Sequence, residues 1–486
     1  MDFEIANNSH FLFCYHLAKE LFASLPDGRF FLQTQVSGDI VRATARFASD
    51  RDDLTVSQSA SIKREFGLSR AENLAVGKAA WELFTNLSDR RPPYGVLVGV
   101  RPTKVALYYL EHGLSDPELI DRLTHDYFVR KEKALLLLKL AKTEKRIVEN
   151  LASSDAVLYL SIPFCPSRCK YCSFISQSAP KQLARLDEYL SRMREELQKT
   201  AELFFGIGKT LKAVYLGGGT PGVLTEAQLD ALFCELEADF NLSPDTEITA
   251  ELGRPDTVTA EKLRVLSDHG IRRVCINPQT LSDEVLRENG RSHTAKQFYD
   301  AYSLARKTGR FCINADLIAG LSGDTPQGFL KSLTEILALD PENLTIHSLC
   351  KKRASEDESA FLAASEGIWT GAVSDAMHAC INRGYEPYYL YRQKNTIENL
   401  ENLGYAKPGQ ECVYNIAMME DLCDVFSVGA GAITKLISKK GPHQKIRRFA
   451  SYKYPTEYLS DPGKREKRFM EIKRLYMENP DDPVVL

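Results

Sequence analysis

The stretch AVLYLSIPFCPSRCKYC, from Ala156 to Cys172, joins a short apolar run to three closely spaced cysteines. Its β-branched and aromatic residues, ended by a proline, are typical of a buried strand. The cysteines follow with three and then two residues between them, which places all three thiols on one loop directly after that strand. In a parallel α/β fold, such a loop lies where active sites are built.

Five further runs of the same kind follow, and segments of helix length separate them. The six runs comprise residues 156–164, 212–219, 247–253, 272–279, 312–320 and 343–349. Repeated βα units predict a parallel sheet with right-handed crossovers. We therefore expect an α/β fold in which residues 151–350 form a partial (β/α)6 TIM-like barrel, with the site at the carboxyl ends of its strands.

The flanking regions have a different texture. Within residues 1–150, the segment 31–47 alternates apolar and polar residues like antiparallel strands turned at Ser37–Asp39, and helical patterns follow it. This predicts an α+β N-terminal domain, to which the sequence assigns no role. Residues 351–486 are mixed, with one strand expected over 423–436. We expect this C-terminal extension to cover the barrel and to contribute to the substrate site.

Composition narrows the class of protein. The 486 residues are 44% hydrophobic and 26% charged, and the net charge of −3 offers no global field that would attract a nucleic acid. The acidic N-terminus does not read as a signal peptide, and no run approaches the roughly 18 apolar residues of a spanning helix. These features predict a cytoplasmic protein with no nucleic-acid partner and no membrane span. Its eleven cysteines are then core residues, metal ligands or reactive thiols.

The thiols of Cys165, Cys169 and Cys172 admit three interpretations. A structural zinc ion normally takes four protein ligands, and no fourth cysteine or histidine lies in this loop, although a distant residue could complete the set. Three packed core cysteines are a second alternative. A 4Fe-4S cube explains the count best, because three cysteinates leave one of its four irons open to a substrate or cofactor.

Five motifs of the chain resemble the radical SAM superfamily, and within it the HemZ-type branch of the oxygen-independent coproporphyrinogen III oxidase family. They are YLSIPFC, YLGGGTP, PQTL, GRSH and NADLIAGL, within roughly residues 156–450. The resemblance implies a 4Fe-4S cluster whose open iron binds S-adenosylmethionine (SAM). It also implies that one electron from the cluster cleaves the sulfonium and releases a 5′-deoxyadenosyl radical.

The same resemblance assigns roles to individual residues. The cluster ligands are the three cysteines above, and Tyr171 is the aromatic residue before the third. Tyr159 lies close to the sulfonium and is the candidate catalytic residue. The remaining contacts to SAM are Gly218, Gly219, Thr220, Glu251, Gln279, Arg291 and Asp316. Each of these residues, taken alone, also fits a turn glycine, an internal ion pair, a helix cap or a core tyrosine.

The resemblance further implies a reaction. The radical removes a hydrogen from the β-carbon of a propionate, and loss of carbon dioxide and an electron leaves a vinyl group; two such events convert coproporphyrinogen III to protoporphyrinogen IX. The implied partners are a porphyrinogen or haem and a low-potential donor of the flavodoxin or ferredoxin type. Guanidinium and ammonium groups suit the substrate's carboxylates. The candidates, each of which also fits a solvated charge, are Arg254, Lys352, Arg353 and Arg392.

Two positions depart from the family pattern, since Ser161 stands where a histidine is typical and Phe174 where a further cysteine is typical. The cofactor site tolerates both changes, whereas proton handling and substrate fit do not carry over with it. His347 is a candidate for proton transfer or, alternatively, a core histidine. Other functions remain open: a haem-binding chaperone of the HemW type, or a radical SAM enzyme with another substrate.

Overall fold

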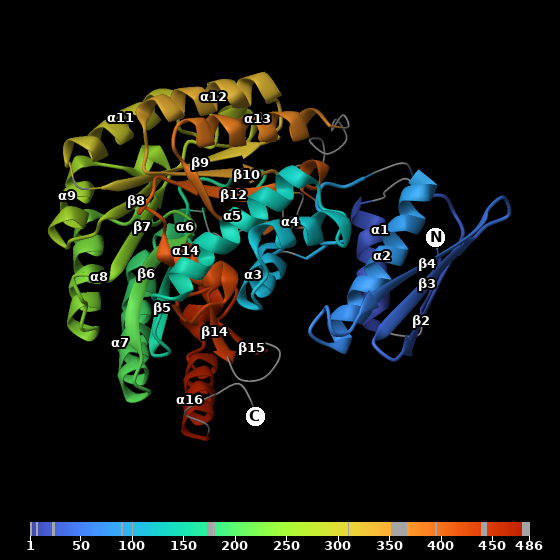
Figure 1. Ribbon diagram of the computed structural model, residues 1–486. Coiled ribbons are helices and arrows are strands. Elements are labelled where there is room, and N and C mark those ends of the chain that lie inside the picture. Colours follow the sequence, from blue (N-terminus) through green and yellow to red (C-terminus); the bar gives the residue numbers. More distant parts are fainter. Residues whose placement is uncertain are drawn as a thin grey trace. The chain divides into compact units, whose positions relative to one another are not determined.

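The computed structural model describes residues 2–5, 8–21, 25–88, 91–99, 101–172, 178, 180–309, 311–350, 367–393, 396–438 and 445–478. The chain forms two compact units (Figure 1). The first comprises Met1–Lys145 with Tyr391–Asn395, and the second comprises Arg146–Leu390 with Thr396–Leu486. A four-stranded sheet lies in the first unit, and an eleven-stranded sheet is the centre of the second.

The sheet of the first unit follows the alternation of its sequence. Its strands lie side by side in chain order, β1 parallel to β2 and the others antiparallel: β1 (Asp2–Ile5), β2 (Arg29–Ser37), β3 (Ile40–Ala48) and β4 (Asp53–Ser61). Alternate residues of β3, among them Val41 and Phe47, are fully buried. Gly38, with φ of +59°, turns the chain between β2 and β3. The predicted hairpin at Ser37–Asp39 is therefore confirmed.

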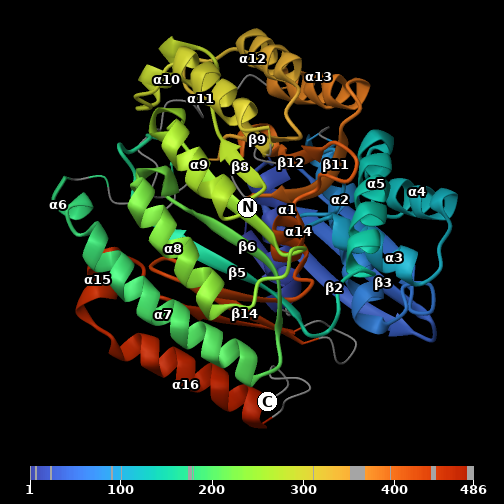
Figure 2. The same cartoon turned by 90° about the vertical axis from the view of Figure 1, so that its left-hand side faces the viewer.

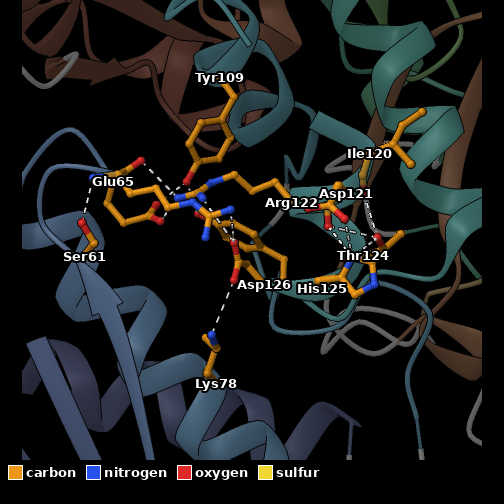
Figure 3. A network of polar contacts seen from close by, with 12 residues as sticks. Ser61, Glu65, Lys78, Tyr109, Ile120, Asp121, Arg122, Thr124, His125 and Asp126 are labelled. Carbon is orange, nitrogen blue, oxygen red and sulfur yellow. Dashed lines mark hydrogen bonds and ion pairs between the residues drawn. The ribbon is translucent and has the colours of Figure 1, made fainter. Parts of the chain in front are cut away.

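Helices α1 (Asn8–Leu21) and α2 (Leu68–Ser88) pack against this sheet, and α3 (Thr103–Glu111), α4 (Asp116–His125) and α5 (Lys131–Val148) follow them in the chain. A buried ionic network joins α3 and α4 to the segment after β4 (Figure 3). The Arg122 guanidinium pairs with the Glu65 carboxylate, and the Tyr109 hydroxyl donates to that same carboxylate. The Arg122 and Glu65 side chains are 3% and 2% exposed, so removing either charge would leave the other buried without its main partner.

Six parallel strands form the centre of the second unit, as the sequence predicts. They are hydrogen-bonded in chain order: β5 (Asp155–Ile162), β6 (Thr210–Gly218), β7 (Glu247–Gly253), β8 (Arg273–Ile276), β9 (Cys312–Ala319) and β10 (Asn343–Ser348). Beyond β10 lie β12 (Glu401–Ala406), which is antiparallel to it, and β11 (Glu386–Arg392). Beyond β5 lie β13 (Asp424–Val428), β14 (Ile433–Ser438) and β15 (Lys445–Ala450). The predicted α/β class with a βα-repeat core is confirmed.

The segment 423–436, predicted as one strand, is instead parts of two strands. Gly429 and Gly431 have φ of +101° and +76° and turn the chain between β13 and the antiparallel β14. Only glycine adopts such angles without strain. β13 pairs with β5 in parallel, with Ser427 opposite Tyr159, and the turn brings the chain back as β14 on the other side of β13. The C-terminal part of the chain therefore widens the central sheet.

The helices that connect the parallel strands cover one face of this sheet (Figure 2). They are α7 (Leu186–Gly206), α8 (Glu226–Asp239), α9 (Ala260–Asp268), α11 (Ala295–Lys307) and α12 (Pro326–Leu339). Four of them begin at a threonine whose hydroxyl accepts a hydrogen bond from a backbone N–H of the first turn: Thr225, Thr259, Thr294 and Thr325. These caps determine where each helix begins and hence how long the loop after each strand is.

Short elements lie in the same loops: α6 (Pro180–Leu183), η1 (Pro221–Val223), η2 (Pro255–Thr257) and α10 (Asp283–Glu288). The later part of the chain contains α13 (Ile368–Asn382), η3 (Ile397–Asn399), α14 (Val413–Glu420), α15 (Pro455–Ser460) and α16 (Gly463–Glu478). From α14, the Tyr414 ring stacks on Tyr215 at 4.7 Å and on Tyr159 at 6.1 Å. None of the helices within the described residues combines the length and apolarity that a membrane crossing requires.

Candidate functional site

The three cysteines lie on the loop that leaves β5, as predicted. Cys165 and Cys169 are each 8% exposed, and Cys172 is partly buried. The loop is bonded to the turn after α10, because the Lys170 N–H donates to the Asn289 carbonyl at 3.1 Å. In that turn Gly290 has φ of +73°, and a Cβ there would lie 3.1 Å from the Arg168 carbonyl oxygen. The cysteine loop and the turn before Arg291 thus form one packed unit.

The glycine-rich end of β6 passes directly against the first cysteine. The Thr220 hydroxyl donates to the Cys165 Sγ at 3.4 Å, and the Thr220 N–H donates to the Phe164 carbonyl at 2.7 Å. A Cβ on Gly219 would lie 2.5 Å from that carbonyl oxygen and 2.9 Å from the Cys165 Sγ. Gly218 has φ of +115°. Only glycines allow this approach, which explains the Gly-Gly-Thr sequence at the strand end.

Arg291 lies beside the second cysteine. Its Nη1 donates to the Tyr171 hydroxyl at 3.2 Å and approaches the Cys169 Sγ at 3.9 Å, while Nη2 donates to the Asn277 carbonyl at 2.7 Å. Burial acts to lower the pKa of Arg291, but Tyr171 and Cys169 outweigh it and raise that pKa. Burial, reinforced by Arg291, lowers the pKa of His293 to about 3. The neutral His293 ring then accepts a hydrogen bond from Arg291 Nε at 3.3 Å.

Two carboxyl groups of the central sheet, Glu251 on β7 and Asp316 on β9, have pKa values shifted in opposite directions. Burial, and then the nearby charge of Asp316, raises the pKa of Glu251 to about 8, while a hydrogen bond with Tyr215 acts against this. For Asp316, burial acts to raise the pKa, but His347 at 3.6 Å and the Asn314 amide at 2.8 Å lower it. Glu251 is therefore mainly protonated at neutral pH, whereas Asp316 is ionised. A cation bound beside them would favour the ionised form of Glu251 as well.

Gln279 occupies an unusual backbone conformation for a residue with a side chain. Its φ is +69°, and hydrogen bonds of 2.9 Å from its N–H to the Asp316 carbonyl and from the Ile318 N–H to its own carbonyl hold it there. Its Oε1 is buried and has no partner among the described residues. A buried acceptor without a donor is costly. The geometry therefore presents an acceptor to a ligand.

Tyr159 lies on β5 and is partly buried. Its ring is nearly parallel to that of Tyr215, with 6.3 Å between the centroids. Burial, and then the charge of Glu251, raises the pKa of the Tyr159 hydroxyl, which is neutral in this environment. Ser161, two residues further, is also buried, and its hydroxyl donates to the Ala430 carbonyl at 2.8 Å. The serine that replaces the typical histidine thus joins β5 to the turn after β13.

Arg254, one of the candidates for binding substrate carboxylates, is buried and bonded to protein groups, which fits neither a substrate contact at the mouth nor a solvated charge. Arg254 is 2% exposed. Its guanidinium pairs with Asp256 at 2.8 Å and donates to the hydroxyls of Ser167 and Ser292. It therefore connects β7, the cysteine loop and the segment after Arg291. The sequence carries no signal for this role beyond the serine between the first two cysteines.

Arg392 is likewise buried rather than available to a substrate. It donates to the Leu97 carbonyl, and its guanidinium lies 4.7 Å from the centre of the Tyr94 ring. The other two candidates, Lys352 and Arg353, lie outside the described residues, as does Phe174. Sequence reasoning also missed Gly290, for which the signal was its position directly before Arg291.

The residues fit the expected cofactors better than they fit zinc. Within the part of the chain that the structure describes, the three cysteines are not among the groups whose ligand atoms all lie within 4.8 Å of one another. Two sulfur ligands of one tetrahedral zinc would lie about 3.8 Å apart. A cube binds each cysteinate at a separate iron and suits wider spacing. Gly219 lets the end of β6 pack directly against Cys165, and the buried Gln279 Oε1, which has no partner among the described residues, offers a contact for a polar cofactor.

Comparison with known proteins agrees with this geometry. Residues 159–336 match the model of the radical SAM superfamily. The chain is 38% identical to the oxygen-independent coproporphyrinogen-III oxidase-like protein HemZ of Bacillus subtilis, over 79% of this chain and 77% of the relative. It is 31% identical to the heme chaperone HemW of the same organism, over 56% of this chain and 69% of that protein.

Among solved structures, coproporphyrinogen III oxidase (HemN) of Escherichia coli aligns with a TM-score of 0.48 and 21% identity, over 70% of this chain and 73% of that chain. The match to HemZ is both close enough and long enough to place the sequence in a family. The chain belongs to the radical SAM superfamily, and within it to the HemZ-type branch of the oxygen-independent coproporphyrinogen III oxidase family.

Proposed function

We propose that this protein is a radical SAM oxidative decarboxylase that converts propionate side chains of coproporphyrinogen III to vinyl groups. The superfamily implies a 4Fe-4S cluster and SAM. In this proposal Cys165, Cys169 and Cys172 hold the cluster. When bound, the cluster and SAM together supply the one-electron chemistry that removes a hydrogen atom from a substrate carbon.

The observation that carries the proposal is the packing of the glycine-rich strand end and Arg291 against the cysteine loop. Gly219 and Thr220 hold the backbone after β6 directly against Cys165, and so place it beside a ligand that the cluster would bind. Arg291 brings a guanidinium to Cys169, where a ligand's carboxylate can pair with it. Both are therefore positioned to receive the methionine part of SAM.

The remaining residues are suited to the other parts of SAM. Glu251 is suited to contact a positively charged group, because a cation beside it favours the ionised carboxylate and lowers its raised pKa of about 8. Asp316 and the unpaired Oε1 of Gln279 are acceptors for hydroxyl or amino donors. Tyr159 and Tyr171, both neutral and partly buried, limit the access of water to the site.

The substrate assignment rests on the family. The HemZ relative is named an oxygen-independent coproporphyrinogen-III oxidase-like protein. In the proposed reaction a propionate, R–CH2–CH2–COO−, becomes R–CH=CH2 and carbon dioxide, while one hydrogen atom and one electron leave. The hydrogen atom comes from the β-carbon, and the electron passes to an acceptor. A flavodoxin or ferredoxin type of donor would supply the low-potential electron that starts each event.

A haem-binding chaperone is the second candidate, and the observation that favours it is the 31% identity to the heme chaperone HemW of Bacillus subtilis. Both functions use the same cysteine loop. They differ in what happens to the tetrapyrrole: an oxidase changes its side chains, whereas a chaperone retains it unchanged.

Anaerobic incubation of the reconstituted protein with coproporphyrinogen III, SAM and a reductant distinguishes the two. We expect products with one and two vinyl groups, measured by liquid chromatography and mass spectrometry. Stoichiometric retention of haem without turnover would support the chaperone instead. Cys169→Ala should abolish turnover, whereas Gly206→Ala, where an added Cβ meets nothing within 4 Å, should not.

A further inference from the structure

Helices α8 and α9 are neighbours on the helical face of the second unit (Figure 2), and they carry a group of side chains that could ligate a metal ion. Asp230, Cys234 and Glu237 follow one another at spacings of four and three residues along α8, which places them on one side of that helix. His269 is the C-terminal cap of α9. One ligand atom each from Asp230, Cys234 and His269 all lie within 4.8 Å of one another.

Carboxylates face both nitrogens of the His269 ring. Nδ1 lies 2.7 Å from Glu237 Oε1, and Nε2 lies 3.0 Å from Asp230 Oδ1. A neutral imidazole has only one N–H, so one of these contacts needs either a second proton or a metal ion. If Nδ1–H donates to Glu237, the Nε2 lone pair points to Asp230. A histidine held in this way by a carboxylate is the usual arrangement at protein zinc sites.

The exposure of these side chains is suited to a metal ion that enters from solvent. The His269 side chain is only 10% exposed, and its ring lies 5.7 Å from that of Phe233, which keeps it in place. The Asp230 side chain is 59% exposed and Cys234 is exposed, so an ion can enter from solvent without a change of fold. The ligands therefore belong to a site that is open on one side.

The chemistry of the set selects the metal. Calcium and magnesium take oxygen ligands, whereas a thiolate, an imidazole and a carboxylate together favour zinc. Zn²⁺ bound by a carboxylate of Asp230, a thiolate of Cys234 and the neutral His269 has no net charge. A water molecule can complete four ligands. Glu237 then remains hydrogen-bonded to Nδ1.

We propose that Asp230, Cys234 and His269 bind one Zn²⁺, with Glu237 as the residue that orients the histidine. The ion connects α8 to α9, the helices that follow β6 and β7. It therefore links two consecutive βα units to each other through the helices that cover the sheet. This site shares no residue with the cluster and SAM site, and its test does not depend on the proposed reaction.

Zinc binding to the cluster-reconstituted protein tests the proposal. After incubation with zinc chloride and removal of the excess, we expect one zinc per chain by elemental analysis. The zinc K-edge absorption spectrum should show one sulfur at about 2.3 Å and otherwise nitrogen and oxygen neighbours. Three sulfur neighbours would place the ion at Cys165, Cys169 and Cys172 and would overturn the proposal, as would the absence of retained zinc.

Variants locate the site. Cys234→Ser and His269→Gln should each weaken zinc binding about tenfold or more, because each removes a direct ligand. Glu235→Gln is the matched control, since Glu235 lies on the same helix but pairs with Arg194 at 2.9 Å. Unchanged zinc affinity in both ligand variants would leave His269 as a protonated bridge between two carboxylates and contradict the metal site. Far-ultraviolet circular dichroism checks that each variant is folded.

Discussion

Arg254 Nη1 donates a 2.5 Å hydrogen bond to the Ser167 hydroxyl, and through it the end of β7 holds the loop between Cys165 and Cys169. The same guanidinium pairs with Asp256 and donates to Ser292, one residue after Arg291. Residues that hydrogen-bond to metal ligands, or to the loop that carries them, commonly affect metal affinity almost as strongly as the ligands themselves. Arg254 is therefore a positioning residue for the proposed cluster.

Arg254→Met should weaken retention of the cluster about 10- to 100-fold, because the loop loses its anchor while all three cysteines remain. Iron and sulfide content after anaerobic desalting measures this. Arg254→Lys, which keeps the charge but not the forked geometry, should recover only part of the loss. The electron paramagnetic resonance signal of the reduced cluster should also change in Arg254→Lys. Arg264→Met, an exposed site on α9, is the control, and an equal loss there would contradict the role of Arg254.

Gly219→Ala should prevent cluster assembly. The added Cβ would lie 2.5 Å from the Phe164 carbonyl oxygen and 2.9 Å from the Cys165 Sγ, and neither atom can move without displacing the cysteine loop. Gly206→Ala is the matched control, because a Cβ at Gly206 meets nothing within 4 Å. We expect iron content near zero for the first variant and unchanged for the second. Full iron content in Gly219→Ala would show that the loop does not depend on this close approach.

Much of the central sheet was predictable from the sequence, since the runs 247–253 and 343–349 coincide with β7 and β10 to within one residue. Buried parallel strands are continuous apolar runs, and the caps at Thr225 and Thr294 separate them clearly from helices. The turn at Gly429 was not predictable, because a short strand ending in Gly-Ala-Gly reads equally as one bulged strand.

The location of the three cysteines on one loop after β5 was predictable from their spacing, whereas the contacts of a buried side chain distant in sequence were not. Three cysteines at that spacing have few alternative uses, whereas the glycines after β6 taken alone also fit a turn. Arg254 has many, and only its burial and its bonds to Ser167 and Asp256 distinguish a positioning residue from a surface charge. The ion pair of Glu65 with Arg122 was equally hidden, because 56 residues separate the two in the sequence.

Gln279→Gly should weaken the binding of SAM without lowering the stability of the protein. A glycine accepts the φ of +69° without strain, and we expect the free energy of unfolding to stay equal or rise by about 1 kcal/mol. The same change removes the unpaired Oε1, and SAM should therefore bind more weakly. Chemical unfolding and equilibrium dialysis with labelled SAM measure the two effects. Weaker SAM binding together with lower stability would point to a structural role for the side chain instead.

Glu251 should make stability depend on pH. Its pKa of about 8 in the folded protein lies above the ordinary value of 4.5, so the folded state keeps a proton that the unfolded chain releases. Its contribution to stability is therefore complete below about pH 4.5 and is lost as the pH rises through about 8. Chemical unfolding of the ligand-free protein at pH 5.5, about 7 and about 8.5 should show a steeper decline than for Glu251→Gln.

The same carboxyl should couple SAM binding to protons. Because a cation favours the ionised form, SAM should bind more tightly as the pH rises towards 8, and at neutral pH binding should release a proton from Glu251. Calorimetry in buffers of different ionisation enthalpy measures that release, and Glu251→Gln should abolish it. Glu261→Gln, at an exposed position on α9, controls for the loss of a carboxylate. A proton release that persists in Glu251→Gln would move the titrating group elsewhere, and Asp316, whose pKa is already low, could not supply it.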